Sequence, residues 1–267
     1  MTESSGRGDP RRSMELLWEL GAGPTRGPKP GLTLRAIVTA AVELADAEGL
    51  SALSMRRVAE RLGKSAMAIY TYVPGKAELL DLMLDTALGE LPTSYPLDKG
   101  WRPAVEASAR DGWEFYERHP WVLQISGARA LLGPHEFDCY ESQLRLFDGL
   151  GLPGGEIARI VAVVHGFVRG AAKAVSDAAT AEQATGLSDD DWWEARAPVL
   201  EEIMGDQFAE RYPTAARLDA EDHAFVQLDR AEDDDTPYTV RDALDTFEFG
   251  LQRLLDGIET YIEARSG

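Results

Sequence analysis

The sequence is poor in cysteine, in basic residues and in long hydrophobic runs. A single cysteine, Cys139, excludes an internal disulfide framework and any zinc site built on cysteine. The four histidines lie far apart and show no metal-binding spacing, so we expect neither a metal nor a cofactor. No apolar run approaches the roughly 20 residues that cross a bilayer, and the N-terminus lacks the apolar core of a secretory signal. We therefore expect a cytoplasmic protein without a membrane partner.

The few basic residues are unevenly distributed. The net charge of the chain is −19, which argues against nucleic acid because DNA binding draws on Lys and Arg contacts with phosphates. Residues 1–80, however, carry eleven Lys and Arg against nine Asp and Glu, a net charge of +2. Residues 81–267 carry sixteen against thirty-seven, a net charge of −21. The first third is therefore the one region where DNA binding is not opposed by charge.

Apolar residues recur with helical spacing in nearly every long segment, and no segment shows the sustained alternation of a strand, so we expect an all-α fold. The chain divides into a flexible arm over 1–32 with one amphipathic piece, Ser13–Leu20, a compact region over 33–80, and a larger helical body over 81–267. Helices of the body are expected at about 101–118, 120–126, 134–150, 154–179, 189–211 and 240–264. The acidic stretch 212–235 is expected to be a mobile loop.

Helix start and stop signals are dense between residues 33 and 91. Thr33, Ser54 and Ser65 are placed to cap three successive helices, and Gly49 and Gly63 to end the first two. A fourth helix is expected over 76–91, ended by Pro92. One side of the first helix is marked by Ile37, Ala41, Leu44 and Glu48. The residues expected to face inward on the next two helices are Met55, Val58, Ala59, Leu62, Ile69 and Val73.

Two short helices joined by a glycine-containing turn are typical of a helix-turn-helix. In that arrangement the helix over 54–62 crosses the DNA backbone, and the helix over 65–72 lies in the major groove. Its outward residues can touch thymine methyl groups or reach bases and phosphates, and Ser65 with the first amides of the helix can bind a phosphate. The outward residues are Ala66, Met67, Tyr70 and Thr71. The candidate phosphate contacts around them are Arg56, Arg57, Lys64 and Lys76.

Residues 33–91 resemble the N-terminal domain of the tetracycline-repressor (TetR) family. The resemblance is carried by MRRVAERLGKSAMAIYTYVPGKAELLDLML, with Leu62-Gly63 at the turn, Ile69-Tyr70-x-Tyr72-Val73 on the third helix and Gly75-Lys76 opening the fourth. It implies a dimeric, usually repressing regulator, not an enzyme, that leaves a palindromic operator when a small molecule binds. It also implies that Tyr70, Tyr72 and Lys76 contact the DNA backbone, and that Arg56 and Ala66–Met67 contact base edges.

The arm before this domain has two interpretations. Arg26 and Lys29, in TRGPKPG, can enter the minor groove as the basic arms of homeodomains do. Alternatively, the arm is a disordered leader.

A small-molecule pocket is expected among aromatic residues of the body. Three of the six tryptophans, Trp101, Trp113 and Trp121, fall within residues 101–125. Aromatic faces with a few polar groups are the usual composition of such a pocket, although the same residues can form ordinary core. The candidate ligand-binding residues are Trp113, Tyr116, His119, Trp121, Gln124, His165 and Arg169.

A helix-turn-helix reader binds two half-sites and so requires a homodimer. Two helices have suitable apolar surfaces, although either can instead be buried within the monomer. The candidate interface residues are Ile160, Val164 and Phe167 on one helix and Phe247, Leu251, Leu254, Leu255, Ile258 and Ile262 on the other.

Three functions remain open at this point. The first is a repressor released from operator DNA by a small, largely apolar or aromatic effector. The second is a regulator that acts through protein partners without induced release. The third is an all-α enzyme that uses the region of His119 or His165 for acid–base chemistry, although the sequence has no nucleophile motif and no phosphate-binding glycine loop.

Overall fold

The computed structural model describes residues 3–4, 9–21, 32–127, 129–205, 207–222 and 238–266. Regular structure within these ranges is almost entirely helical, which confirms the expected all-α class. The described strands are β1 (Glu3–Ser4) and β2 (Ile125–Ser126), which pair in parallel. None of the described helices combines the length and the apolarity that a membrane span requires.

The chain folds as two compact units. The first contains Met1–Ala172 and Leu251–Gly267, and the second contains Lys173–Gly250. Helices α8 (Gly154–Thr185) and α12 (Tyr238–Ser266) each contribute residues to both units. The first unit therefore includes the whole helix-turn-helix region and most of the helical body.

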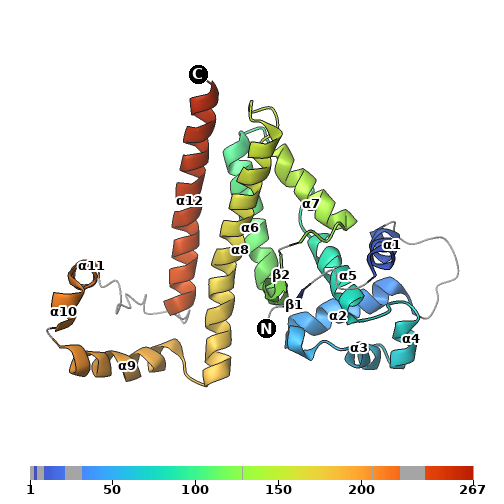
Figure 1. Ribbon diagram of the computed structural model, residues 1–267, viewed down its shortest axis with the longest axis horizontal. Coiled ribbons are helices and arrows are strands. Elements are labelled where there is room, and N and C mark those ends of the chain that lie inside the picture. The colour runs from blue at the N-terminus through green and yellow to red at the C-terminus, as the bar shows by residue number, and fades with distance from the viewer. Residues whose placement is uncertain are drawn as a thin grey trace. The chain divides into compact units, whose positions relative to one another are not determined.

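Three helices build the region that begins at Thr33 (Figure 1). They are α2 (Leu34–Glu48), α3 (Met55–Arg61) and α4 (Ala66–Tyr70), with a 3₁₀ turn, Leu50–Ala52, between the first two. All three begin at the predicted caps, where the hydroxyl accepts a hydrogen bond from the backbone N–H three residues on, at 3.1, 3.2 and 3.3 Å. The helix boundaries predicted here are thus confirmed to within about two residues.

The predicted core of this region is largely confirmed. The residues found buried are Ile37, Ala41, Leu44, Met55, Val58, Ala59, Ile69 and Val73. Leu62 is half-buried. Glu48, at the end of the same side of α2, is exposed, and its carboxylate binds the Arg57 guanidinium at 2.7 Å.

Helix α5 (Lys76–Leu88) leaves the compact region and packs against both α2 and α7 (Pro134–Arg145). Helix α1 (Pro10–Gly21) packs on α5 and α7, and Leu16 and Leu17 are buried there. The amphipathic piece expected within the N-terminal arm is therefore docked on the first unit and does not lie free.

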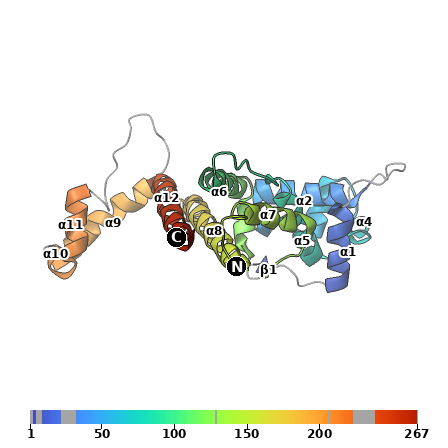
Figure 2. The same ribbon diagram turned by 90° about the horizontal axis from the view of Figure 1, so that it is seen from above.

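Helix α6 (Trp101–Arg118) matches its predicted bounds and is followed by a 3₁₀ helix, η2 (Pro120–Gln124). The predicted helix over 120–126 is thus shorter and tighter than expected, because its last two residues form β2. Within the first unit, the part of α8 up to Ala172 and the part of α12 from Leu251 lie side by side (Figures 1 and 2), and residues of both line a common groove. The buried core of α12 includes Leu251 and Leu255.

The second unit contains α9 (Asp189–Met204), α10 (Gln207–Arg211) and α11 (Pro213–Asp222). The prediction of a single helix over 189–211 was wrong, because Gly205 takes a φ of +46° and ends α9. The acidic stretch 212–235 was predicted to be a loop, but residues 213–222 form α11. The rest of that stretch lies outside the described residues.

Candidate nucleic-acid interface and ligand cavity

Helices α3 and α4 form a helix-turn-helix whose turn depends on Gly63. This residue has a φ of +64°, in the left-handed region that favours glycine. Ile69 and Val73 are buried beneath the turn, so α4 must present its opposite face outward. Met67, Tyr70 and the Thr71 side chain are exposed as predicted, while Ala66 is half-buried.

The hydroxyls near this face are engaged within the chain. Thr71 donates to the carbonyl of Met67 at 3.2 Å, and Tyr72 donates to the carbonyl of Leu32 at 3.1 Å. Ser65 accepts the backbone N–H of Ala68 as the cap of α4, which leaves its hydroxyl hydrogen able to donate. Tyr72 therefore fastens the chain just before α2 to the end of α4, a structural contact that the sequence did not indicate.

The arginines of α3 are held by carboxylates. Arg56 pairs with Glu60 at 2.7 Å, Arg57 binds Glu48 through both carboxylate oxygens, and Arg61 pairs with Glu43 at 3.0 Å. These pairs are exposed to solvent, which screens the attraction between the charges, so a phosphate can compete for the guanidinium groups at low cost.

The two lysines also border the interface. Lys64 is exposed in the turn, and Lys76 is half-buried at the first residue of α5. Arg26 and Lys29, the candidates for the minor groove, lie outside the described residues.

A cavity of about 570 Å³ lies in the first unit, between α5, α6, α7 and α8. Two predicted ligand-binding residues, Tyr116 and His165, line it, with Tyr116 Oη 3.0 Å from His165 Nε2. Partial burial, and then the charge of Arg169, lower the pKa of His165. This end of the cavity therefore offers an uncharged, hydrogen-bonding pair at neutral pH.

Arg169 lies beside the cavity and supports its wall. Its guanidinium donates to the carbonyls of Leu123 and Ile125 at 3.2 and 2.7 Å, and it stacks over the Tyr116 ring at 5.8 Å. It thus holds the end of η2, whose carbonyl groups lack helical partners.

His119 is buried outside the cavity lining, between two carboxylates. Its Nδ1 lies 2.7 Å from Asp46 of α2, and its Nε2 lies 3.1 Å from Glu90, just after α5. Asp46 also accepts from the indole N–H of Trp121 at 2.6 Å. This cluster fastens α2 to the segment that joins α6 and η2, which is a structural role for both aromatic residues.

The other predicted ligand-binding residues are also absent from the lining. Trp113 is buried in the core, and Gln124 is exposed. Trp101, named with them in the aromatic cluster, packs on Phe147 with ring centroids 5.7 Å apart.

Several lining residues were missed by sequence reasoning. Helix α7 contributes Glu136, Cys139, Tyr140 and Gln143, which share the i, i+3, i+4, i+7 spacing of one helix face. That spacing was the available signal. Gln143 accepts from the Ser108 hydroxyl at 2.8 Å, and burial raises the pKa of the Cys139 thiol to about 12, so the thiol remains neutral.

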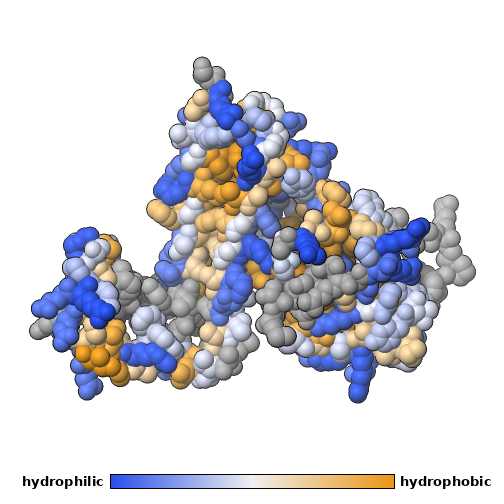
Figure 3. Space-filling view, viewed as in Figure 1, coloured by the Kyte–Doolittle hydropathy of each residue, from blue (hydrophilic) through white to orange (hydrophobic). Residues whose placement is uncertain are grey.

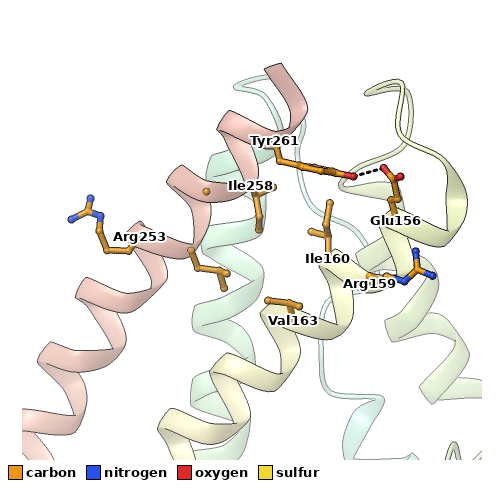
Figure 4. Close-up of a pocket in the computed structure, with 9 residues that line it drawn as sticks. Glu156, Arg159, Ile160, Val163, Arg253, Ile258 and Tyr261 are labelled. Atoms are coloured by element: carbon orange, nitrogen blue, oxygen red, sulfur yellow. Dashed lines mark hydrogen bonds between the residues drawn. The ribbon is translucent and has the colours of Figure 1, made fainter. Parts of the chain in front are cut away.

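The groove between α8 and α12 has a volume of about 530 Å³ and includes three of the predicted interface residues, Ile160, Leu254 and Ile258. In Figure 4, Ile160 and Val163 of α8 face Ile258 of α12, and the Tyr261 hydroxyl donates to Glu156 at 2.8 Å. Figure 3 shows hydrophobic surface over this part of the two helices.

The remaining predicted interface residues are enclosed by the chain itself. Phe167 is half-buried. The others are buried: Val164, Phe247, Leu251, Leu255 and Ile262.

Two family models match the chain. Residues 37–83 match the bacterial regulatory proteins of the tetR family, and residues 95–262 match the tetracyclin repressor-like C-terminal domain. The chain is 45% identical over 269 residues to the HTH-type transcriptional repressor DrrR1 of Streptomyces coeruleorubidus, covering 100% of this chain and 92% of that protein. The chain belongs to the TetR family.

Solved structures of this family have the same fold. Apo ActR of Streptomyces coelicolor superposes with a TM-score of 0.66 at 24% identity, over 89% of this chain and 99% of that one. ActR in complex with actinorhodin gives 0.65 at 28% identity, over 85% and 94%. As a TetR-family member, the chain is a DNA-binding transcriptional regulator.

The family matches leave part of the structure unmatched. Helix α1 precedes both matched ranges, and residues 84–94, which include the end of α5, lie between them. Helix α1, which contacts α5 and α7, therefore lies outside the ranges that the two family models match.

Proposed function

We propose that this protein is a homodimeric repressor that releases a palindromic operator when a small, largely apolar or aromatic molecule enters the cavity. The observation that carries the proposal is the shared use of α5. Lys76 opens this helix beside the helix-turn-helix, and Leu84 and Leu88 of the same helix line the cavity. The repressor name of DrrR1 and the ligand-bound ActR structures support it.

The DNA contacts in this proposal come from α3, α4 and the start of α5. Tyr70 is half exposed on α4, and Arg56 is exposed on α3. We assign Tyr70 and Lys76 to the DNA backbone, and Arg56 to a base edge or phosphate. Tyr72 contacts the backbone as well if its hydroxyl exchanges the Leu32 carbonyl for a phosphate. Arg57 and Lys64 serve as phosphate contacts, as do Ser65 and, from the arm, Arg26 and Lys29 in the minor groove.

The dimer in this proposal forms through the groove of α8 and α12. Ile160, Val163, Leu254 and Ile258 supply its apolar surface, and the 52% exposure of Val163 leaves that side chain available to a second copy. A two-fold axis along such a face repeats the same patch on both subunits, which matches a palindromic operator.

Asp85 provides the mechanical link between α5 and the cavity wall. This buried carboxylate on α5 accepts the backbone N–H of Glu136 at 3.1 Å, in the first turn of α7. Burial raises the pKa of Asp85, while that N–H opposes the rise. A ligand that displaces α7 therefore also displaces α5. The distance between the two recognition helices of the dimer then no longer matches the spacing of the operator half-sites.

His119 provides a second link, directly to α2. Its ring packs against Phe115, which lines the cavity, with centroids 5.3 Å apart. Movement of Phe115 on ligand entry therefore shifts His119 and, through its hydrogen bond, Asp46 of α2. In this proposal neither His119 nor His165 carries out catalysis. The effector is bound and released unchanged in the bacterial cytoplasm.

A mobility-shift assay on the region upstream of the protein's own gene tests DNA binding. We expect specific binding that weakens steeply with salt, because phosphate contacts release counterions. The double variant Arg56→Ala plus Tyr70→Ala is expected to lose about 1–3 kcal/mol of binding free energy per contact. Arg145→Ala is the matched control, since it removes the same charge from an exposed i, i+4 pair in the body. Equal affinity of the double variant and the wild type contradicts the proposal.

A separate titration tests release. Planar aromatic molecules, actinorhodin among them, are added to the protein–duplex complex, and the free duplex is measured. Ala162→Phe places a large side chain at a residue that lines the cavity. We expect this variant to bind duplex normally and to resist release by the molecules that release the wild type. Release of the variant at wild-type concentrations would place the effector elsewhere.

A further inference from the structure

Helix α4, the recognition helix of the helix-turn-helix, carries no side chain suited to bidentate recognition of a base. Residues 65–72 read SAMAIYTY, without any Arg, Lys, Asn, Gln, Asp, Glu or His. The usual hydrogen-bonding readers of guanine are Arg and Lys, and those of adenine are Asn and Gln. Helix α4 therefore cannot identify either purine in that way.

Of the four hydroxyls over residues 65–72, two donate within the chain and a third caps the helix. The Thr71 hydroxyl donates to the Met67 carbonyl at 3.2 Å, and the Ser65 hydroxyl accepts from the N–H of Ala68 at 3.3 Å. The Tyr72 hydroxyl donates to the Leu32 carbonyl. The Tyr70 hydroxyl lies at the C-terminal end of the helix, where the chain leaves the groove in the docking geometry of this motif.

The outward face of α4 presents the apolar side chain of Met67. Its side chain is 73% exposed, more than any other large hydrophobic side chain in the described part of the chain. It lies on the second residue of α4, among the N-terminal residues that contact base edges in a helix-turn-helix. A thioether on an unbranched chain adapts to an irregular apolar surface, and it neither donates a hydrogen bond nor accepts one strongly.

The major groove offers one apolar group, the C5-methyl of thymine. We propose that Met67 packs on a thymine methyl once in each half-site, so that α4 specifies its operator position by hydrophobic contact and not by hydrogen bonds. This inference rests on the proposed function, because it requires α4 to enter the major groove. Hydrogen-bond readout in the same half-site then falls to residues outside α4, of which Arg56 on α3 is one.

Deoxyuridine tests the contact, because it pairs as thymine does and lacks only the methyl group. The wild-type protein first enriches its preferred duplex from a random pool, and each thymine of that duplex is then replaced singly and in symmetric pairs. We expect one position per half-site where the replacement weakens binding about fourfold, the equivalent of ~0.8 kcal/mol for one carbon group buried. The symmetric pair is expected to weaken binding about fifteenfold, since the two half-sites add.

The variant Met67→Ala completes a double-mutant cycle. Because the variant changes both subunits, we expect its affinity for the thymine duplex to fall to about that of the wild type for the duplex with the symmetric pair of deoxyuridines. No further loss is expected when the variant binds that deoxyuridine duplex. Because Met67 is exposed, its thermal unfolding midpoint is expected to equal that of the wild type, which separates the effect from misfolding.

Two results overturn the inference. One is a wild type that binds every deoxyuridine duplex within about 1.5-fold of the thymine duplex, and the other is a Met67→Ala protein that keeps the full sensitivity. Both leave DNA binding intact, so they contradict this inference alone. A wild type that enriches no duplex contradicts the proposed function and this inference together.

Discussion

At the scale of residues, the polar groups buried in the first unit act chiefly as fasteners between helices. His119 is the clearest case, since both of its ring nitrogens face carboxylate oxygens, one on α2 and one after α5. Both nitrogens can donate only when the ring is protonated. Sequence reasoning placed this residue in a pocket because an aromatic cluster does not indicate which of its members meet carboxylates.

Removing His119 tests the fastening. His119→Ala leaves Asp46 and Glu90 without their central partner, and we expect a loss of about 1–3 kcal/mol in the free energy of unfolding. The loss is smaller than for a fully buried pair because both carboxylates are partly exposed. Urea unfolding followed by tryptophan fluorescence measures it. The control Arg118→Ala, which removes an exposed partner of Glu90, is expected to cost less than about 1 kcal/mol. Equal losses in the two variants contradict the assignment.

His165 predicts a pH effect of defined sign. Partial burial and the charge of Arg169 lower its pKa below the ordinary 6.5, so the folded protein binds fewer protons there than the unfolded chain. Its contribution to stability is present above about pH 6.5 and is lost as the pH falls toward the lowered pKa. Urea unfolding at pH 7.5 and 5.5 should therefore show a smaller loss on acidification for His165→Gln than for the wild type. A variant that loses as much as the wild type would contradict the prediction.

At the scale of elements, α5 and the start of α7 form the connection between the reading helices and the cavity. The turn before α7 is closely fitted, since Leu131 and Leu132 donate their backbone N–H groups to Glu136 at 3.1 and 2.7 Å. Gly133 caps the helix and has no room for a side chain. A Cβ at this position would overlap the Asp85 carboxylate. The sequence predicted the start of α7 but not what lies against it.

Gly133→Ala tests this fit. The added methyl must displace Asp85 or the turn, and we expect a loss of about 1–3 kcal/mol in the free energy of unfolding. Gly127→Ala is the matched control, because a Cβ at that glycine meets nothing within 4 Å. In the release titration, Gly133→Ala is also expected to need more effector than the wild type, since Asp85 no longer couples α5 to α7. Stability equal to that of the control would contradict the close fit.

At the scale of the whole molecule, the distribution of charge along the chain bears on where DNA binds, and the apolar groove of α8 and α12 bears on dimerisation. Residues 1–80, which contain α3 and α4, carry a net charge of +2, whereas residues 81–267 carry −21, a charge of the sign that repels DNA phosphates. The apolar groove of α8 and α12 lies in that acidic part of the chain. The groove proposed for dimerisation therefore lies in the part of the chain whose net charge opposes DNA binding.

A charge placed in the groove tests the dimer. Val163→Asp puts a carboxylate on an exposed position of the lining, where the monomer tolerates it and a second copy does not. We expect the protein to sediment as a monomer in analytical ultracentrifugation and to lose most of its operator affinity. Leu97→Asp, at a position of similar exposure outside the groove, is expected to remain dimeric. A dimeric Val163→Asp protein would contradict the proposed interface.

The sequence by itself determined the all-α class, the capped helices of the reading region, the outward position of Met67 and Tyr70, and the family. These features depend on residues within a turn or two of one another, where capping and periodicity act. Tertiary structure alone decided that Tyr116 and His165 meet in a cavity while Trp121 and His119 fasten α2, and that Leu251 and Leu255 are core while Leu254 lines a groove. The reason is physical: an amphipathic helix requires that its apolar face be covered, but only the packing of distant segments determines what covers it.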